Sequence, residues 1–369
     1  MNSSSSSSSS PRTPASSLSK SPRPSSATPK PNATSPNPTP SSSKPPKPKT
    51  SPPRKRARTT TTPPRSKSTN DLTRARSASS ATSSDVKVLL VGGESATARA
   101  MTPLLLARGW HVISVVDDGA GKDAVQAMAS PGGKLSAVVQ SLPRTSYTSA
   151  RAIIAATSPS YVVWAASSTP HTIEAVEYGA FVAFAQAALV SPGVKKYLAL
   201  SYLHVRRHAA PWWSDEDVDL VARTRALAPE YYDARARADA YLAAMGLVRR
   251  RGGDRGFQAM SLRPSMVTDS EGTGRVNMTR VGARGAVPRA DVAEVAVRLL
   301  ARDDSYGYFD LEGGVNDLSE EIEYAVTEFD ASEGEFDSAD ALLAEHGWGE
   351  GRVEGGRKRR ATPPRRSTG

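Results

Sequence analysis

A short loop near residue 92 has the residue types that bind phosphate. The apolar run 86–91 leads into two glycines and then into an alanine-rich stretch. This order predicts a strand buried on both faces, a tight turn and a helix. The N-terminal amides and the dipole of a helix attract a pyrophosphate at such a turn. We therefore predict that a dinucleotide binds at Gly92, Gly93, Ser95, Ala96 and Thr97.

The loop departs from the G-x-x-G-x-x-G/A spacing at one position. Gly92 occupies the first motif position, which forms the tight turn, and Ala98 occupies the last, which allows close packing of helix and strand. Ser95 replaces the middle glycine. Glu94 either stabilises the helix N-terminus by about 0.3–1 kcal/mol or repels a phosphate, for which Arg99 compensates. An ordinary strand-to-helix turn without a ligand is the alternative interpretation.

Asp117 is a second candidate cofactor-binding residue. It follows the next apolar run and lies 25 positions after Gly92. A carboxylate at this place accepts hydrogen bonds from the adenosine ribose and repels a 2'-phosphate, which favours NAD over NADP. The alternative is a surface aspartate that begins a turn before Gly119.

The elements that position these residues alternate along the chain. Strands are predicted at 86–91, 110–116, 135–139, 161–166, 196–200, 257–262 and 308–311, and helices at 96–108, 172–190, 230–245, 291–300 and 317–329. Pro103 either kinks the first helix or marks a later start at Thr102. The polar segment 204–228 reads as an inserted loop and helix. The alternation predicts an α/β fold: a single Rossmann-type doubly wound parallel sheet with helices on both faces.

Charge and composition divide the chain into three parts. Residues 1–84 hold 26 Ser and 16 Pro with a net charge of +14, and residues 352–369 carry +6, so the whole-chain charge of +11 leaves −9 between them. The first segment cannot bury enough apolar surface to offset its ordering entropy. We predict a disordered basic tail at 1–84, an NAD(P)-binding domain at 85–330, and an acidic-then-basic flexible tail at 331–369.

Several classes of site are excluded by residue type. The chain has no Cys, which excludes disulfides, thiolate zinc sites and Cys nucleophiles. It has no run of about 18 apolar residues that would span a membrane. His204 and His208 have a metal-binding spacing but no third ligand nearby, so no metal site is predicted. Ser201, His204 and Asp215 have the residue types of a hydrolase triad, but no G-x-S-x-G motif surrounds the serine.

The basic clusters at 55–58 and 357–360 suggest partners for the tails. Each is a short Lys/Arg run that either binds a nuclear import receptor or contacts polyanions nonspecifically. We expect a nuclear or cytoplasmic location. A mitochondrial transit peptide is disfavoured, because the prolines oppose the amphipathic helix that such peptides form.

Five segments, taken in order, carry a family resemblance. They are VKVLLVGGESATARAMTPLLLARGWHV at 86–112, YLALS at 197–201, YYDARARADAYL at 231–242, SLRPSMVTDSEGTGRV at 261–276 and PRADVAEVAVRLL at 288–300. Their order and spacing resemble an atypical short-chain dehydrogenase/reductase, of the fungal-type NAD(P)-binding proteins related to the extended and nitrogen-regulator-like branch. The resemblance covers about residues 85–326.

This resemblance implies a set of reacting residues. The family uses a Tyr as acid and base, a Lys four residues later that lowers the Tyr pKa, and a Ser that orients the substrate oxygen. By position these are Tyr231, Arg235 in place of the Lys, and Ser201. Arg263 and Pro264 match the segment that passes beside the nicotinamide. From the residues alone, Ser201 reads equally as a hydroxyl that caps backbone, and Tyr231 and Arg235 as a helix surface pair. Trp212 and Trp213 either line a substrate pocket or only pack against other side chains.

The resulting hypothesis is an NAD(P)-binding oxidoreductase that moves hydride to or from a small carbonyl or alcohol. A non-catalytic dinucleotide-sensing regulatory protein is the alternative, since Arg235 replaces the Lys. A scaffold that binds no nucleotide is a third interpretation, because Glu94 and Ser95 both oppose phosphate.

Overall fold

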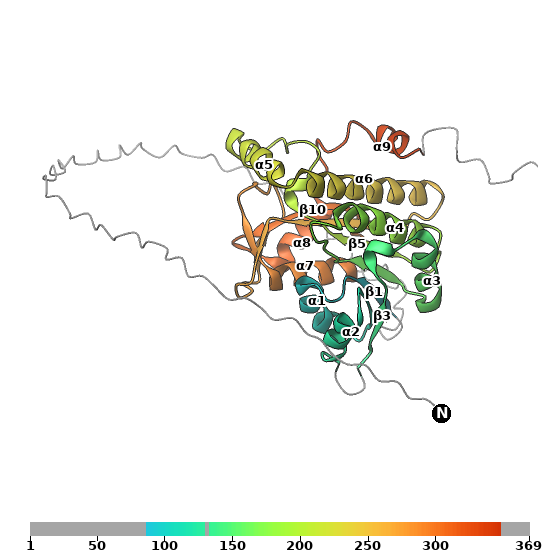
Figure 1. Cartoon of the computed structure of the whole chain (residues 1–369). Helices are drawn as coiled ribbons and strands as arrows, with labels where there is room; N and C mark the ends of the chain where they lie inside the picture. Colours follow the sequence, from blue (N-terminus) through green and yellow to red (C-terminus); the bar gives the residue numbers. More distant parts are fainter. Residues whose placement is uncertain (1–85, 130–132, 348–369) are drawn as a thin grey trace, which may run out of the picture. The chain divides into compact units, whose positions relative to one another are not determined.

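The computed structural model describes residues 86–129 and 133–347 (Figure 1). Within these residues, the main sheet has the order β11-β8-β10-β6-β5-β4-β1-β2-β3. The strands from β10 to β3 are parallel, and β8 pairs antiparallel with β10 and β11. The sheet strands are β1 (Lys87–Val91), β2 (His111–Val116), β3 (Leu135–Val139), β4 (Tyr161–Trp164), β5 (Lys196–Leu200), β6 (Gln258–Pro264), β8 (Arg275–Asn277), β10 (Gly307–Gly313) and β11 (Asn316–Asp317). The predicted α/β fold with a parallel sheet is confirmed.

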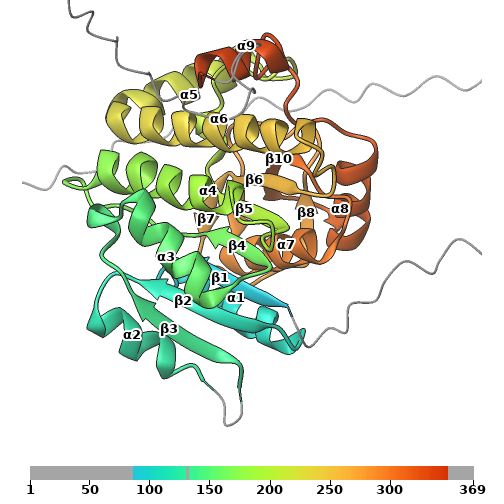
Figure 2. The same cartoon turned by 90° about the vertical axis from the view of Figure 1, so that its right-hand side faces the viewer.

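Helices cover both faces of this sheet (Figures 1 and 2). Apolar residues of β1 alternate between the two faces: Val88 and Leu90 belong to one buried cluster, and Leu89 and Val91 to the other. The first cluster includes α1 (Ala96–Ala107), α7 (Arg289–Ala301) and α8 (Leu318–Thr327), and the second α3 (Tyr147–Thr157), α4 (Phe181–Leu189) and α6 (Pro229–Arg251). The run of apolar residues in β1 therefore reflects burial on both faces.

The helix α1 begins at Ala96 and contains Pro103. Of the two starts that the sequence allowed, the earlier one is correct. The Ser95 hydroxyl accepts a hydrogen bond from the Ala98 N–H (3.2 Å), which caps the helix. The proline lies in the second turn, and its missing N–H costs one intrahelical hydrogen bond without ending the helix.

Several elements were not predicted from the sequence. They are α2 (Gly119–Gln126), α3, the short strands β7 (Met266–Thr268) and β9 (Ala286–Pro288), which pair with each other, and the strands β8 and β11. The segment 204–228 contains the helix α5 (Asp215–Leu227), as expected for an inserted loop and helix. A 3-10 turn, η4 (Leu203–Val205), overlaps the start of the segment. Strands of two or three residues are too short to show a period in the sequence.

The predicted domain boundary at residue 330 differs from the structure. Residues 331–347 continue the folded unit, and α9 (Ala339–Glu345) packs on the outer side of α6 (Figure 2). Leu342 and Leu343 are buried there against Ala240 and Ala244. This acidic segment was predicted as part of a flexible tail, but its two adjacent leucines pack a short helix against the alanines of α6.

The predictions for residues 1–84 and for the basic end of the chain lie outside the described residues. Among the described residues, no helix is long and apolar enough to cross a membrane.

Candidate functional site

The loop between β1 and α1 lies at the carboxyl edge of the sheet. Gly92 has a φ of +79°, and a Cβ there would lie 2.3 Å from the Ala166 Cα, in the chain that leaves β4. A Cβ on Gly93 would lie 2.5 Å from the Ser114 Cβ of β2. Both glycines are therefore required by the close approach of neighbouring strand ends, and this packing holds the start of α1 at the edge.

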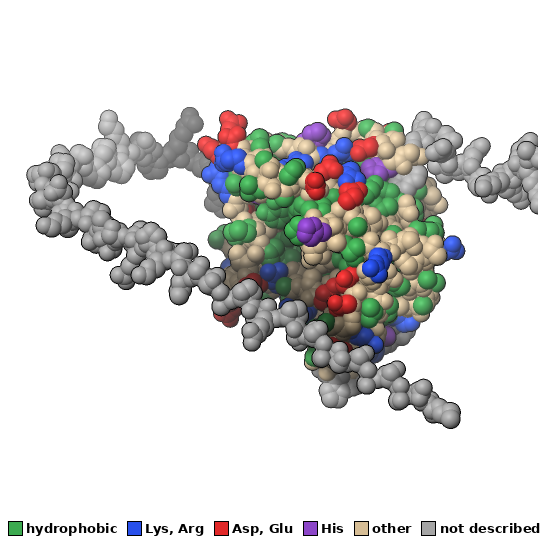
Figure 3. Space-filling model, in the orientation of Figure 1, with side chains coloured by type: hydrophobic (Ala, Val, Ile, Leu, Met, Phe, Trp, Pro, Cys, Tyr) green, Lys and Arg blue, Asp and Glu red, His purple; other side chains and the backbone are tan. Residues whose placement is uncertain are grey.

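The first amides of α1 face this edge without intrahelical partners, as in every helix. The side chains around them are partly open: Ala96 is exposed, and Ser95 and Thr97 are partly exposed. In the space-filling view the surface is hollowed beside α1, on the side of the molecule at which α6 begins (Figure 3). The Ser95 hydroxyl takes the Ala98 N–H, so the N–H groups of Ala96 and Thr97 are the donors that the start of α1 offers next to this recess, an arrangement that suits a diphosphate.

Glu94 turns away from α1 and toward the end of β2. Its Oε1 accepts a hydrogen bond from the Asp117 N–H (3.3 Å), and its Oε2 is buried with no hydrogen-bond partner among the described residues. Burial raises the pKa of the Glu94 carboxyl, and the charges of Asp117 and Asp118 raise it further. No ion pair links Glu94 to Arg99 within the described part of the chain. An unpartnered buried carboxyl oxygen fits a hydroxyl donor and opposes a phosphate.

Asp117 is exposed at the same edge. Its Oδ1 accepts a hydrogen bond from the Leu142 N–H (2.7 Å), which ties β2 to the short turn η2 (Leu142–Arg144), while Asp118 caps α2 through the Gly121 N–H (2.9 Å). Three carboxyl groups, those of Glu94, Asp117 and Asp118, therefore gather where β2 ends. This acidic group disfavours any ligand that would place a phosphate there.

An arginine that the sequence analysis missed lies at the start of α1. The Arg289 guanidinium donates to the Thr97 hydroxyl (3.0 Å) and to the Asp269 carboxylate (2.7 Å). It thus joins the first turn of α7 and the loop after β7 to the helix N-terminus. Arg289 lies 192 positions after Thr97, so no local sequence pattern predicted their contact. A guanidinium beside helix N-terminal amides strengthens an anion site.

The three predicted reacting residues meet where β5 ends and α6 begins. The Ser201 hydroxyl donates to the Asp239 Oδ2 (2.7 Å), and the Arg235 guanidinium donates to the carbonyl oxygen of Leu200, the residue before Ser201. Tyr231, Arg235 and Asp239 are spaced by four residues, so they share one face of α6. Ser201 and Arg235 are thus joined through Asp239 and the Leu200 carbonyl. Tyr231 lies near enough to Arg235 and Asp239 for their charges to act on its pKa.

The charge of Arg235 is paired within the protein. Its guanidinium donates to the Glu177 Oε2 (3.0 Å), and both side chains are at most 5% exposed. Glu177 belongs to a π-helical segment, η3 (Glu174–Ala180), a form often found at functional sites. Its Oε1 accepts from the Ser168 N–H (2.8 Å) in the loop after β4. This pair fixes the start of α6 against the carboxyl ends of β4 and β5.

Burial also shifts the ionisation of this group. It raises the pKa of the Tyr231 hydroxyl, against the opposing effect of the Arg235 charge, and it raises the pKa of Asp239 against Arg235 and Arg263. Neither Glu177 nor Asp239 was predicted as a functional residue. The available signal was a helix whose polar residues at 231, 235 and 239 fall on one face among alanines.

Arg263 points away from the edge. It is fully buried and donates to the Asp310 carboxylate (2.7 Å) and to the Ala331 carbonyl (3.2 Å), in a cluster with Arg206 and Glu335. Pro264, which follows it, ends β6. The structure thus places the Arg263 side chain in a buried ion cluster, where its guanidinium is paired within the protein, although its backbone lies next to Ser201, whose N–H donates to the Leu262 carbonyl (2.8 Å).

Trp212 and Trp213 are held by the loop before β9. Both indole N–H groups donate to the Val281 carbonyl (3.0 and 2.9 Å), and the Arg206 guanidinium contacts both rings. His204 is buried, with its Nε2 2.7 Å from the Ala283 carbonyl oxygen. Among the described residues no group of three or more His, Cys, Asp or Glu is arranged to hold a metal.

Comparisons with known proteins agree with this geometry. A protein-family model described as NAD(P)H-binding matches residues 92–303, more than half of the chain. A comparison with curated proteins gives no match. Among solved structures, a putative NAD-dependent epimerase/dehydratase from Bacillus halodurans is similar at 19% identity and a TM-score of 0.50, over 64% of this chain and 99% of that chain.

Two other solved structures are similar with lower TM-scores. An oxidoreductase from Lactococcus lactis has 18% identity and a TM-score of 0.49, over 64% of this chain and 95% of that one. An enzyme from Bordetella bronchiseptica, solved in complex with NAD+, has 16% identity and a TM-score of 0.45, over 65% of this chain and 80% of that one. At these identities the likeness concerns the fold alone.

Proposed function

The chain belongs to the NAD(P)H-binding family, and on that premise we propose that it is an oxidoreductase of the short-chain dehydrogenase/reductase type that acts on a small carbonyl or alcohol. The observation that carries the proposal is the group formed where β5 ends and α6 begins. Ser201 donates to Asp239, Arg235 donates to the Leu200 carbonyl, and Tyr231 lies within reach of the Arg235 charge. The finer placement in the fungal, nitrogen-regulator-like branch is part of the same proposal.

The residues at the edge fit a nicotinamide dinucleotide. The α1 amides and the Arg289 guanidinium suit its diphosphate, and the carboxyls of Asp117 and Glu94 suit the adenosine ribose hydroxyls. The same carboxyls repel a 2'-phosphate, so we propose NAD over NADP as the cofactor. When bound, the dinucleotide supplies or accepts the hydride.

Tyr231 is proposed as the group that exchanges the proton. In reduction its hydroxyl donates to the substrate oxygen, and in oxidation its phenolate accepts the proton of the alcohol. Arg235 stabilises the phenolate through its charge, which opposes the effect of burial on the pKa of Tyr231. Because Glu177 and the Leu200 carbonyl already take hydrogen bonds from Arg235, its role is electrostatic and it is not expected to hold the ribose.

Ser201 is proposed to position the substrate. In the structure its one O–H donates to Asp239. The single hydroxyl proton of an alcohol goes to the Tyr231 phenolate, so an alcohol and a carbonyl both need Ser201 as the donor to their oxygen. In either case the Ser201 hydroxyl has to turn away from Asp239.

A non-catalytic, dinucleotide-sensing role is the second candidate. The observation in its favour is that the residue in the place of the family's Lys is locked in an ion pair with Glu177, 58 positions away in the sequence. An arginine held in this way stabilises the carboxyl edge of the sheet without taking part in a reaction.

Two measurements separate these functions. Titration with NADH and NADPH, followed by energy transfer from the five tryptophans, should show binding, with NADH preferred. Hydride turnover on a panel of aldehydes, ketones and alcohols should fall by about 100-fold or more in Tyr231→Phe with unchanged NADH binding. Binding without turnover on the whole panel supports the sensing role, and no binding at millimolar cofactor contradicts both.

A further inference from the structure

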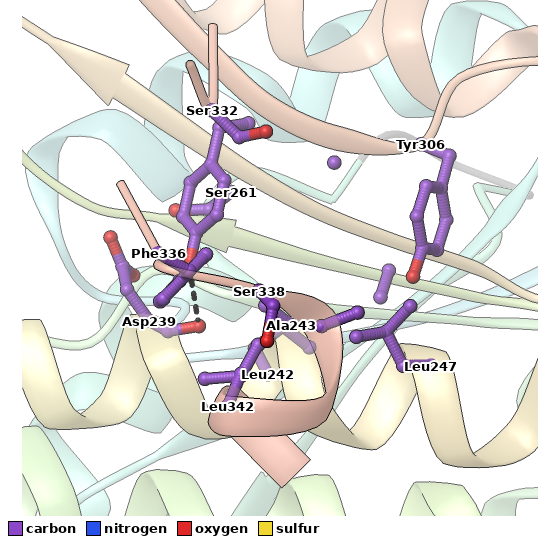
Figure 4. Close-up of a pocket in the computed structure, with 14 residues that line it drawn as sticks. Asp239, Leu242, Ala243, Leu247, Ser261, Tyr306, Ser332, Phe336, Ser338 and Leu342 are labelled. Carbon is purple, nitrogen blue, oxygen red and sulfur yellow. Dashed lines mark hydrogen bonds between the residues drawn. The ribbon is translucent and has the colours of Figure 1, made fainter. Parts of the chain in front are cut away.

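A cavity of about 250 Å³ lies along α6, from Asp239 toward the C-terminal half of the helix. It opens between α6, α9 and the first residues of β10, and it is separate from the α1 loop. Its walls combine apolar side chains with a few polar ones (Figure 4). The apolar walls come from Leu242, Ala243 and Leu247 of α6 and from Phe336 and Leu342 near α9.

The polar side chains are grouped toward the ends of the cavity. Figure 4 shows Asp239 and Ser261 toward one end and Tyr306 toward the other. Ser261 is 3% exposed and its hydroxyl makes no hydrogen bond of normal geometry among the described residues, although it lies close enough to Asp239 to lower the pKa of that carboxyl. A buried hydroxyl that lines a cavity and has at most a weak contact with the neighbouring carboxyl is free to bond to a ligand.

The charge balance around Asp239 limits the kind of ligand. Arg235 and Arg263 already act on this carboxyl, so its charge is compensated within the protein. An anion would be repelled by Asp239, and a cation would add a second positive charge beside a carboxyl that the two arginines already compensate. A neutral hydroxyl can donate to the carboxyl and accept from Ser261 at no charge cost.

The size of the cavity limits the ligand further. An apolar cavity of about 150 Å³ is enough to bind benzene in another protein. The present cavity is larger and has one polar end, so a single ring or short chain that bears a hydroxyl fills it.

We propose that this cavity is a second ligand site, which takes a small neutral alcohol or phenol with its hydroxyl at Asp239 and Ser261 and its apolar part between α6 and α9. Asp239 also accepts the hydrogen bond of Ser201. One carboxyl therefore contacts both the cavity and the proposed reacting group, which connects the two sites.

The site can be tested without any dinucleotide, so the result does not depend on the proposed function. The probes are 4-fluorobenzyl alcohol and 4-fluorotoluene, which differ in the hydroxyl, followed by fluorine NMR in the presence of the full chain. We expect the alcohol to bind about 10-fold more tightly than 4-fluorotoluene, since a hydrogen bond to a charged group contributes to affinity at this level.

Variants locate the binding. Ala243→Phe fills the cavity from α6 and should abolish binding of both probes, whereas Ala341→Phe, on the exposed side of α9, should leave it unchanged. Ser261→Ala should weaken binding of the alcohol alone. If Ala243→Phe does not fold, as judged by its thermal unfolding, Ala339→Phe closes the same cavity from its rim.

Three results would overturn the proposal. They are the absence of binding of either probe at millimolar concentration, equal binding to the wild type and to the cavity-filling variants, and equal affinity of the two probes. The first two would show that no site exists in the cavity, and the third that Asp239 and Ser261 do not select a hydroxyl.

Discussion

The first turns of α1 and α6 lie at the same edge of the sheet, but their polar groups are in different states. Around α1, the N–H groups of Ala96 and Thr97 have no partner within the helix, Asp117 is exposed, and Arg289 is partly exposed. Around α6, Ser201, Arg235 and Asp239 are buried and hydrogen-bonded within the protein. The comparison suggests that the α1 side is ready to receive an external ligand, whereas the α6 side is already assembled and acts through charge and position.

The largest expected effect is on the assembled side. Glu177→Gln removes one partner of a buried ion pair and leaves the Arg235 charge uncompensated, so it should lower the free energy of unfolding by about 3–5 kcal/mol. The matched control is Glu174→Gln in the same π-helical segment, whose partner Arg237 is 37% exposed; its effect should stay below about 1 kcal/mol. Chemical denaturation measures both. If both variants lower the free energy of unfolding equally, the buried ion pair contributes no more to stability than the exposed one.

The second prediction concerns the pH dependence of turnover. Burial raises the pKa of Tyr231, so the hydroxyl stays protonated through neutral and mildly alkaline pH. Reduction needs the protonated form and should persist until pH rises through this raised value. Oxidation needs the phenolate and should increase about 10-fold per pH unit between roughly pH 7 and 9, because that form grows by this factor below the pKa. Profiles of kcat/KM in both directions measure this. A flat oxidation profile would exclude Tyr231 as the titrating group.

On the open side, Arg289→Gln should weaken dinucleotide binding by about 10-fold, since it removes a charge-assisted hydrogen bond to the diphosphate. Arg284→Gln is the control, because Arg284 is exposed on the preceding loop and pairs with Glu216. Calorimetric titration with NADH gives both affinities. If the two variants bind NADH equally well, Arg289 serves only to join Thr97 to Asp269.

The smallest expected effect is on the choice between cofactors. Replacing Asp117 by Ala removes one of three carboxyls at the end of β2 and should raise the affinity for NADPH relative to NADH by a few-fold, as the repulsion of a 2'-phosphate falls. Adding Glu94→Gln should increase the shift, and Asp123→Asn, exposed on α2, should cause none. If the ratio of the NADPH and NADH affinities is unchanged in the double variant, these carboxyls do not determine the choice of cofactor.

The comparison also shows where prediction from sequence succeeded. The glycine loop, Asp117 and Ser201 each lie directly after a buried apolar run, so their places at the carboxyl edge follow from the local pattern. Tyr231 and Arg235 were named through the family resemblance. Asp239 shares their helix face, but its contact with Ser201 spans 38 positions. Glu177 and Arg289 were missed because their contacts span 58 and 192 positions, which no local pattern reveals.

The sequence by itself determined the α/β class, the edge where the polar residues gather and the acidic balance of the folded part, since all of these follow from local periodicity and residue type. Only the tertiary structure decided that Arg235 is paired with Glu177, that Arg263 lies in a buried ion cluster, and that residues 331–347 close a cavity against α6. The reason is physical: burial determines whether a charge is available to a ligand, and burial depends on segments that meet only when the chain has folded.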